Sequence, residues 1–237
     1  MIIIDSAFKS LAEYLSDGKG YEVSRPAVCP WVSCGESNCF WKHTAYSRDV
    51  LDNEEPVSLT IQRFKCRYCG LVVSYLFSFL VPYRRYSATV VAGSAELYAT
   101  APVLKALASY RKIADNVGCA RMSVFRWVES LGTKSQGLRS QVQKEFMLAG
   151  RAWQTLSAVP EEGKSPSASR AKSTEKEKQL NELFALVEIS KVFFCSVESV
   201  LEKLHTYFLK NVESPQLILC GRTISNWTQQ KLGHVLR

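Results

Sequence analysis

Four of the eight cysteines stand in two close pairs, a pattern that is typical of metal binding. Cys29 and Cys34 enclose Pro-Trp-Val-Ser, Cys66 and Cys69 enclose Arg-Tyr, and 31 residues lie between the two pairs. Zinc prefers four soft ligands in a closed tetrahedron, and two short cysteine turns held by a small sheet supply them. A glycine follows the second cysteine of each pair, where it lets the turn tighten around the sulfurs. We therefore predict a structural zinc ion bound by Cys29, Cys34, Cys66 and Cys69.

The ligands of the first turn have alternatives. Four residues also separate Cys34 from Cys39, and His43 lies close by, so either residue could replace a ligand. We prefer Cys29 with Cys34, because this turn opens on Cys-Pro and closes on Cys-Gly, and the second turn likewise closes on Cys-Gly at Cys69-Gly70. Four protein ligands leave no position open for water, which favours a structural role over a catalytic one. A ribbon without a large core should need its metal to fold.

A second motif, in residues 110–128, has the pattern of a helix-turn-helix. Ala114 is small where the two helices would cross, and Gly118 stands in the turn, where a positive φ is needed. The positions expected to face the interhelical core are all apolar: Ile113, Val117, Cys119, Val124 and Trp127. The alternative is a three-helix fold that is used for protein contact.

The second helix of this motif supplies candidate DNA contacts. The residues expected to face outward are Arg121, Met122, Ser123, Phe125 and Arg126. A recognition helix enters the major groove by its N-terminal part, so Arg121, Ser123 and Arg126 are the candidates for base edges. Arginine can bond guanine in bidentate fashion. Arg111 and Lys112, at the start of the preceding helix, suit the phosphate backbone.

The positive charge is confined to one part of the chain. The net charge is +8, and residues 61–151 hold fourteen Lys/Arg against four Asp/Glu, which gives +10 there and −2 elsewhere. Like charges attract a phosphate backbone most when they share a face, so this distribution favours a nucleic-acid partner. A solvated basic surface without a partner is the alternative.

The sequence patterns around these side chains predict an α+β protein, in which a zinc ribbon is followed by mainly helical segments. Residues 58–66 alternate as one half-buried strand, and residues 71–75 form the returning strand. The first residues predict a short strand and then a short helix with Phe8, Leu11, Tyr14 and Leu15 on one face. From residue 87 to about residue 159 the pattern is helical, with an interruption at Pro102.

We expect four parts along the chain. Residues 1–86 hold the N-terminal segment and the zinc ribbon, and residues 87–160 hold the helix-turn-helix and a trailing helix. Residues 161–178 have no large apolar side chain and predict a flexible linker. In residues 179–237 apolar residues recur every seven positions, the spacing of helices that pair, which would allow a homodimer. The apolar stripe is wide, so packing within the chain's own domain is the alternative.

The sequence predicts a cytoplasmic protein with no membrane partner. No stretch approaches the roughly eighteen apolar residues that a membrane span needs, and the start lacks the basic flank of a signal peptide. In the cytoplasm close cysteine pairs bind metal rather than form disulfides.

Several stretches together resemble a known group of proteins. These are the three isoleucines at 2–4, the Cys-Pro turn, Arg-Phe-Lys-Cys-Arg-Tyr-Cys-Gly at 63–70, and Ser-Phe-Leu-Val-Pro-Tyr-Arg-Arg-Tyr-Ser at 78–87. Over roughly residues 1–131 the chain is similar to bacterial transposase-like proteins encoded in or near insertion sequences. The resemblance implies DNA binding, for instance to element ends, with zinc at the four cysteines and a place in the bacterial nucleoid. The first cysteine turn departs from the group, because it is wider than the usual two-residue spacing.

We expect a sequence-specific double-stranded DNA-binding protein of a mobile element, acting as repressor or as accessory to a separate transposase. We expect no enzyme, because a DDE transposase needs three carboxylates on a ribonuclease-H-like core with two metal ions. Asp115 falls inside the helix-turn-helix, and Glu188, Glu198 and Glu202 fall on one helical segment. His205 is expected to be a surface or core histidine. The alternatives are a protein-interaction adaptor and a truncated transposase that lacks its catalytic core.

Overall fold

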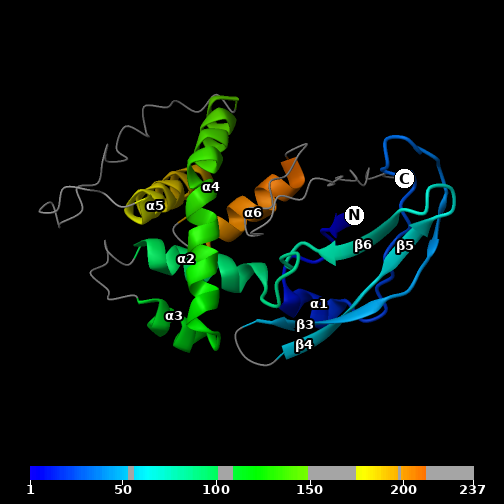
Figure 1. The fold of residues 1–237 in the computed structure, drawn as a ribbon, viewed down its shortest axis with the longest axis horizontal. Helices are drawn as coiled ribbons and strands as arrows, with labels where there is room; N and C mark the ends of the chain where they lie inside the picture. The colour runs from blue at the N-terminus through cyan, green and yellow to red at the C-terminus, as the bar shows by residue number, and fades with distance from the viewer. Residues whose placement is uncertain (53–55, 101–108, 149–174, 197–198, 212–237) are drawn as a thin grey trace, which may run out of the picture. The chain divides into compact units, whose positions relative to one another are not determined.

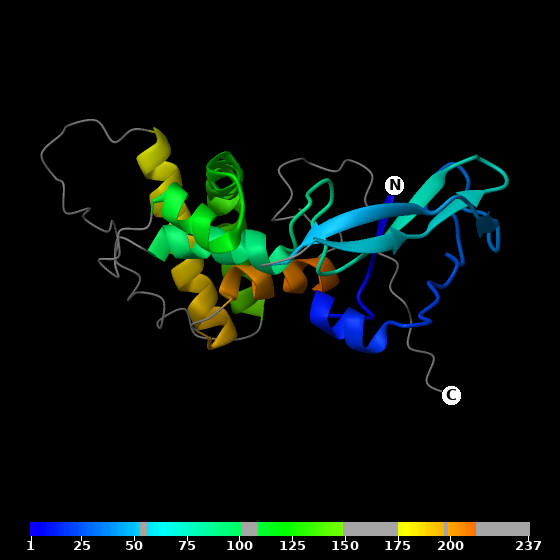
Figure 2. The same cartoon turned by 90° about the horizontal axis from the view of Figure 1, so that it is seen from below.

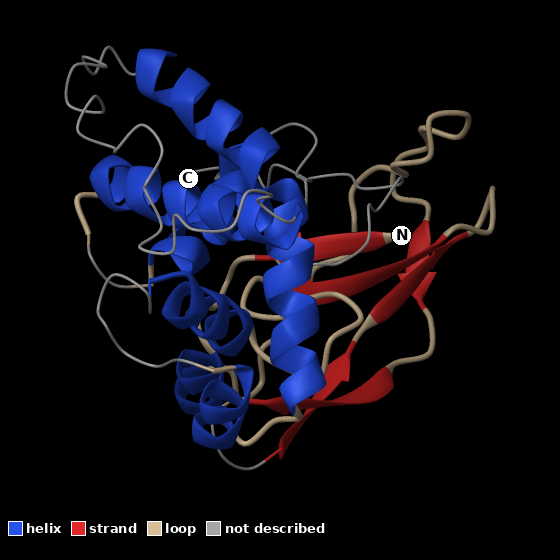
Figure 3. Ribbon diagram, turned by 60° about the vertical axis from the view of Figure 1, so that its left-hand side comes forward, coloured by secondary structure: helices blue, strands red, loops and turns tan. Residues whose placement is uncertain are grey.

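The computed structural model describes residues 1–237 except 53–55, 101–108, 149–174, 197–198 and 212–237. The mixed helix and strand content confirms the α+β class. The chain divides into two units: unit 1 comprises residues 1–88 and 206–237, and unit 2 comprises residues 89–205. Among the described residues, all the strands belong to unit 1, whereas unit 2 is built from helices (Figure 3).

Unit 1 contains a four-stranded sheet. Its strands are β1 (Ile2–Asp5), β6 (Val72–Phe77), β5 (Arg63–Cys66) and β2 (Phe40–Lys42), in that spatial order. β1 runs parallel to β6, while β5 runs antiparallel to both β6 and β2. The strands β5 and β6 lie side by side (Figure 1, Figure 2). Val, Ile, Phe and Tyr fill much of these strands, as suits a pleated surface with one buried face.

A separate hairpin is formed by β3 (Tyr46–Leu51) and β4 (Pro56–Ile61). The prediction of one continuous strand over residues 58–66 is therefore wrong, because β4 ends at Ile61 and β5 begins at Arg63 in the other sheet. Gln62 lies at the junction, and its side-chain amide donates to the carbonyls of His43 and Arg63. The alternation shifts by one residue at the junction, because Gln62 and Arg63 are two polar residues in a row between Ile61 and Phe64, and this shift marks the point where the partner strand changes.

The predicted first helix is α1 (Leu11–Asp17). Ser10 caps it by accepting from the Glu13 N–H at 3.1 Å, and the Glu13 carboxylate accepts from the Lys9 N–H. Leu11 is buried, and it belongs with Phe77 and other side chains to a hydrophobic cluster of unit 1. Leu15, which we predicted on the same face, is 56% exposed, so the apolar face of the helix is narrower than expected.

The helices of unit 2 are α2 (Ala88–Thr100, whose first residue belongs to unit 1), α3 (Tyr110–Val117), α4 (Arg121–Leu148), α5 (Glu175–Phe194) and the start of α6 (Val200–Asn211). α4 and α5 pack against each other (Figure 1). Gly132 permits their close approach, since a Cβ there would lie 3.1 Å from the Gln179 Cβ and 3.2 Å from its backbone oxygen. The rings of Phe146 and Phe193 meet edge to face, 5.0 Å between centroids.

The predicted linker, residues 161–178, lies outside the described residues up to residue 174. Its last four residues, 175–178, form the first turn of α5, in keeping with the good helix propensity of Glu and Lys. The seven-residue apolar spacing is interrupted, because α5 ends at Phe194 and α6 begins at Val200. Val187 and Leu201 are buried within the protein itself. A homodimer stays a prediction.

No helix among the described residues is both long enough and apolar enough to cross a membrane.

Candidate metal centre and basic helix pair

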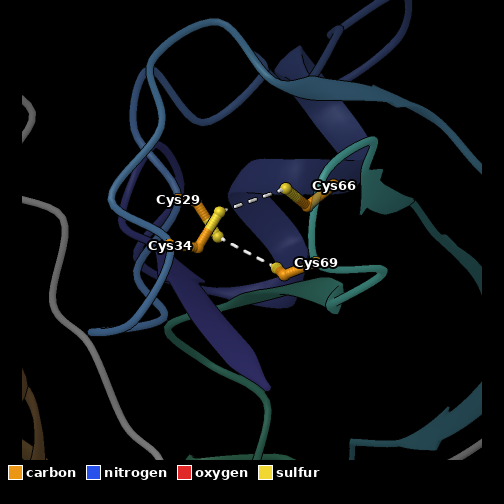
Figure 4. A group of neighbouring side chains, drawn as sticks. All are labelled: Cys29, Cys34, Cys66 and Cys69. Carbon is orange, nitrogen blue, oxygen red and sulfur yellow. Dashed lines mark hydrogen bonds between the residues drawn. The ribbon is translucent and has the colours of Figure 1, made fainter.

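The four predicted cysteine ligands lie together in unit 1, two from each turn (Figure 4). Their Sγ atoms are all within 4.8 Å of one another. The Sγ atoms of Cys29 and Cys69 are 3.6 Å apart, and those of Cys34 and Cys66 are 3.8 Å apart. A regular tetrahedron with metal–sulfur bonds of about 2.3 Å has edges of about 3.8 Å. The four thiols could therefore hold a metal ion in tetrahedral coordination.

A left-handed glycine closes each cysteine turn. Gly35 has φ 60°, and its N–H donates to the Trp31 carbonyl at 3.1 Å. Gly70 has φ 73°, and its N–H donates to the Cys66 carbonyl at 3.2 Å. An L residue with a side chain rarely adopts this φ, which explains why glycine follows the second cysteine of each pair.

The turn geometry prepares Cys66 to bind a cation. Burial disfavours its thiolate, but the backbone N–H groups of Cys69 and Tyr68 and the thiol of Cys39 donate hydrogen bonds to the sulfur. Together these donors lower the pKa of Cys66 to about 6. The site therefore contains one thiol that ionises readily, and the thiolate is the form that ligates metal.

The two thiols of the first turn are harder to ionise. Burial is the main cause that raises the pKa of Cys29 above its ordinary value. The Glu36 N–H lowers the pKa of Cys34, but burial and the thiols of Cys69 and Cys66 raise it, and the net shift is upward. Four thiolates at these distances would repel one another strongly. The cluster is thus stable as a set of thiolates only around a cation.

Neither alternative ligand of the first turn belongs to the four-thiol group. Cys39 is buried beside the site as a hydrogen-bond partner of Cys66, and burial is the main cause that raises the pKa of Cys39 to about 11. His43 lies with its ring edge-to-face on Trp41, 5.4 Å between centroids. The group that could hold a metal consists of Cys29, Cys34, Cys66 and Cys69.

The predicted helix-turn-helix residues form α3, a three-residue connection at 118–120, and the start of α4. Gly118 adopts φ 67°, and its N–H donates to the Ala114 carbonyl as the cap of α3. Ile113, Val124 and Trp127 are buried, as expected of the interhelical core. Val117 and Cys119 are only half-buried.

Four of the five predicted DNA contacts are exposed on this helix pair. They are Arg111 and Lys112 on α3 and Arg121 and Arg126 on α4, while Ser123 is half-buried. The first turn of α4 contains no acidic residue, so the field at its N-terminal end is positive.

Phe125, which we predicted to face outward, instead takes part in an aromatic row. Its ring meets Tyr110 edge to face at 5.5 Å, and Tyr110 stacks on Tyr98 at 4.2 Å. Phe125 therefore ties α4 to α3 and α2 rather than offering a free ring to a ligand.

Of the residues weighed for catalysis, Glu198 lies outside the described residues, and the other carboxylates and the histidine do not form a common site. Glu188 pairs with Lys191 at 2.7 Å, and Glu202 accepts from the Thr89 hydroxyl at 2.8 Å. His205 is buried, which identifies it as a core histidine. Asp115 is exposed on α3.

Sequence reasoning missed a group of side chains on the sheet of unit 1. Trp41 on β2 lies directly opposite Lys65 on β5, and Arg63 follows on the same face. The available signal was a stretch without acidic residues: residues 56–95 contain five Lys/Arg and no Asp/Glu.

Comparison with known families gives a match to a family of unknown function. Residues 29–112 match a family described as a domain of unknown function (DUF6431). The matched span contains all four thiols, the strands from β2 to β6, and α2, and it ends at the third residue of α3. The comparison with curated proteins found no match, and neither did the comparison with solved structures.

Proposed function

We propose that this chain is a sequence-specific double-stranded DNA-binding protein with a structural zinc ion. The observation that carries the proposal is the exposed basic start of α4, with Arg121 and Arg126, at the end of a short turn from α3. Such a helix fits the major groove by its N-terminal part.

Zinc is the metal that the donor set favours. Four thiol sulfurs at tetrahedral spacing suit zinc or iron, and a closed all-cysteine site is the usual form of structural zinc. The ion would join the two cysteine turns, which are distant in sequence, and so hold the β2–β5 end of the sheet.

The two helices would divide the contacts with DNA. Arg121 and Arg126 would read base edges, since arginine can bond guanine bidentately. Arg111 and Lys112 would contact phosphates and set the position of α4 without reading sequence. Ser123 is half-buried, so its hydroxyl would reach a base less readily than either arginine.

The biological setting that we propose is a bacterial mobile element. The chain would act in the cytoplasm as a regulator of transposition or as an accessory to a separate transposase. The resemblance to transposase-like proteins supports this assignment, and we assign the chain no catalytic role.

Selection of preferred duplexes from a random pool tests the proposal. The selected duplex should bind the zinc-loaded protein more tightly than a scrambled one, and the affinity should fall steeply with salt. Arg126→Ala should reduce the preference by about 10- to 100-fold, the cost of one lost arginine–guanine pair.

Two further variants sharpen this experiment. Lys112→Ala should weaken selected and scrambled duplexes alike. Lys144→Ala is the matched control, because Lys144 is an exposed cation near the other end of α4. Equal affinity for selected and scrambled duplexes would exclude sequence-specific binding.

A further inference from the structure

One face of the four-stranded sheet of unit 1 carries an aromatic ring between cations. Phe40, Phe64 and Cys66 point into the core, so the alternating residues point to the opposite face. There Trp41, 39% exposed on the edge strand β2, lies directly opposite Lys65. Arg63 lies two residues before Lys65 on the same strand and face.

The cationic strip continues toward the second cysteine turn. The Lys65 Cε lies 4.0 Å from the place that a Cβ of Gly70 would occupy, so the side chain extends along the sheet to this turn. At the turn, Arg67 is exposed and Tyr68 is 70% exposed. The strip thus presents Trp41 beside lysine and arginine side chains, and Tyr68 is a second exposed ring at the turn that follows.

These cations are not neutralised by neighbouring acids. Among the described residues, no carboxylate forms an ion pair with Arg63, Lys65 or Arg67. The pair formed by Lys42 and Glu22, at 3.4 Å, belongs to the other face of β2. The strip therefore complements an anionic ligand.

Charge alone does not identify that ligand. Four thiolates around a divalent cation carry a net charge of about −2, and Arg67 at the turn offsets part of it. Trp41 remains 39% exposed although the His43 ring lies edge-to-face on it at 5.4 Å, so part of the indole is open to a ligand beside the cations. A ring with cations on either side is the arrangement that stacks a base and pairs its phosphates.

We propose that this sheet face binds single-stranded nucleic acid, with a base on Trp41 and phosphates on Lys65 and Arg63. A single strand is required because the faces of bases in a duplex are covered by their neighbours, whereas unpaired bases stack freely on aromatic side chains. This activity goes beyond the duplex binding proposed for α4 and involves a different unit of the chain.

The test uses the full-length zinc-loaded chain and two labelled probes, oligo(dT) and oligo(rU), of about 16 nucleotides. Fluorescence anisotropy measures the affinity at several salt concentrations. Trp41→Phe keeps a stacking ring and should bind within about two-fold of the parent, whereas Trp41→Leu keeps apolar bulk without a ring and should bind about ten-fold more weakly.

A second pair of variants tests the proposed contact between Lys65 and a phosphate. Lys65→Gln should weaken binding and reduce the salt dependence by roughly 0.7 of a logarithmic unit per logarithmic unit of salt, the value of one phosphate contact. Lys19→Gln is the control, because Lys19 is an exposed cation of unit 1 outside the strands. The zinc content of each variant shows that the site has kept its fold.

The outcomes separate cleanly. Loss of affinity in Trp41→Leu but not in Trp41→Phe, with either probe, supports the proposal, and the tighter probe identifies the sugar. Equal binding by Trp41→Leu and the parent, or no binding of either probe, overturns it. Duplex binding by Arg126→Ala reports on α4 alone, so either proposal can fail without the other.

Discussion

Cys39 lies next to the candidate metal centre but is not one of the four proposed ligands. Its thiol is buried beside Cys66 but stands outside the four-thiol group. Cys66→Ser should abolish stoichiometric zinc binding, because the serine hydroxyl does not ionise at neutral pH, whereas the Cys66 thiol that it replaces ionises readily. Cys39→Ser should keep one zinc per chain with affinity lowered by at most about 10- to 100-fold, the usual cost of a hydrogen-bond partner of a ligand.

Zinc analysis of the two purified variants by mass spectrometry, with a competing chelator for affinity, measures this difference. The parent chain and Cys119→Ser serve as controls, since Cys119 is half-buried in unit 2. Retention of zinc by Cys66→Ser together with its loss from Cys39→Ser would reassign the ligand.

His205 is a second residue whose surroundings make a measurable difference. It is buried, and neither ring nitrogen has a hydrogen-bond partner among the described residues. Burial lowers the pKa of His205 to about 4. The unfolded chain takes up a proton below about pH 6.5 and the folded chain does not until about pH 4, so the free energy of unfolding falls as the pH falls between these values.

His205→Leu should remove this dependence and raise the free energy of unfolding by about 2 kcal/mol near pH 5. Denaturant unfolding followed by circular dichroism at pH 5 and pH 8 measures it. The comparison at pH 8 isolates the cost of two buried nitrogens without partners, because the ring is neutral in both states there. A parent chain as stable at pH 5 as at pH 8 would contradict the assigned burial.

At this scale the sequence predicts what depends on local spacing. The four thiols are found by their two short spacings, and the turn glycines by their position. The surroundings of Leu15 and Phe125 are not predictable in the same way. Leu15 is exposed because the face of α1 that packs on Phe77 is narrow, and Phe125 is held by Tyr110. Both depend on residues that are distant in the chain.

Among the elements, α4 offers a matched pair of glycines. A Cβ on Gly132 would lie 3.1 Å from the Gln179 Cβ, whereas a Cβ on Gly137 would have nothing within 4 Å. Gly137→Ala should stabilise the helix by up to about 1 kcal/mol through helix propensity. Gly132→Ala should gain less or destabilise, and Gly132→Leu should destabilise by about 1–3 kcal/mol or more through overpacking.

Thermal unfolding of unit 2, followed by its helical circular dichroism signal, ranks the three variants. The expected order of melting temperature is Gly137→Ala, then Gly132→Ala, then Gly132→Leu. Equal stabilisation by the two alanines would mean that α5 does not approach α4 at Gly132 as described.

The bounds of a helix or hairpin can be predicted from the sequence when residues within that element set them. The caps at Ser10 and Ser109 and the left-handed Gly118 set the bounds of α1 and α3 locally. The change of sheet between β4 and β5 is decided by partner strands instead. β5 pairs with β6 and β2, whereas β4 pairs with β3. The two adjacent polar residues Gln62 and Arg63 mark the break between β4 and β5, but they do not identify the partner strands.

Removal of the metal should destabilise unit 1 but not unit 2. Cys29, Cys39 and Cys66 are themselves part of one hydrophobic cluster of unit 1, so loss of the ion disturbs the core as well as the turns. We expect a strong chelator to unfold the β2–β5 end of unit 1 while the helices of unit 2 persist. Hydrogen exchange with and without chelator measures this, and added zinc should restore protection in unit 1.

Protection that is lost equally in both units, or in neither, would contradict this prediction.

The fold class follows from the succession of strand and helix patterns in the sequence. The contact between α4 and α5 does not, because residues 149–174 separate them and side-chain packing decides it. The seven-residue spacing of the C-terminal segment equally fits a helix that packs within its own chain.

The parallel pairing of β1 with β6 has a consequence for synthesis on the ribosome. β1 carries three isoleucines and leaves the exit tunnel well before its partner β6, which begins at Val72. Because synthesis adds roughly 5–20 residues per second, this apolar segment remains unpaired for several seconds. Cys69, the last of the four proposed ligands, emerges just before β6, so capture of the ion and pairing of β1 would happen almost together. Cells starved of zinc should therefore yield aggregates of this chain rather than a loose but soluble form.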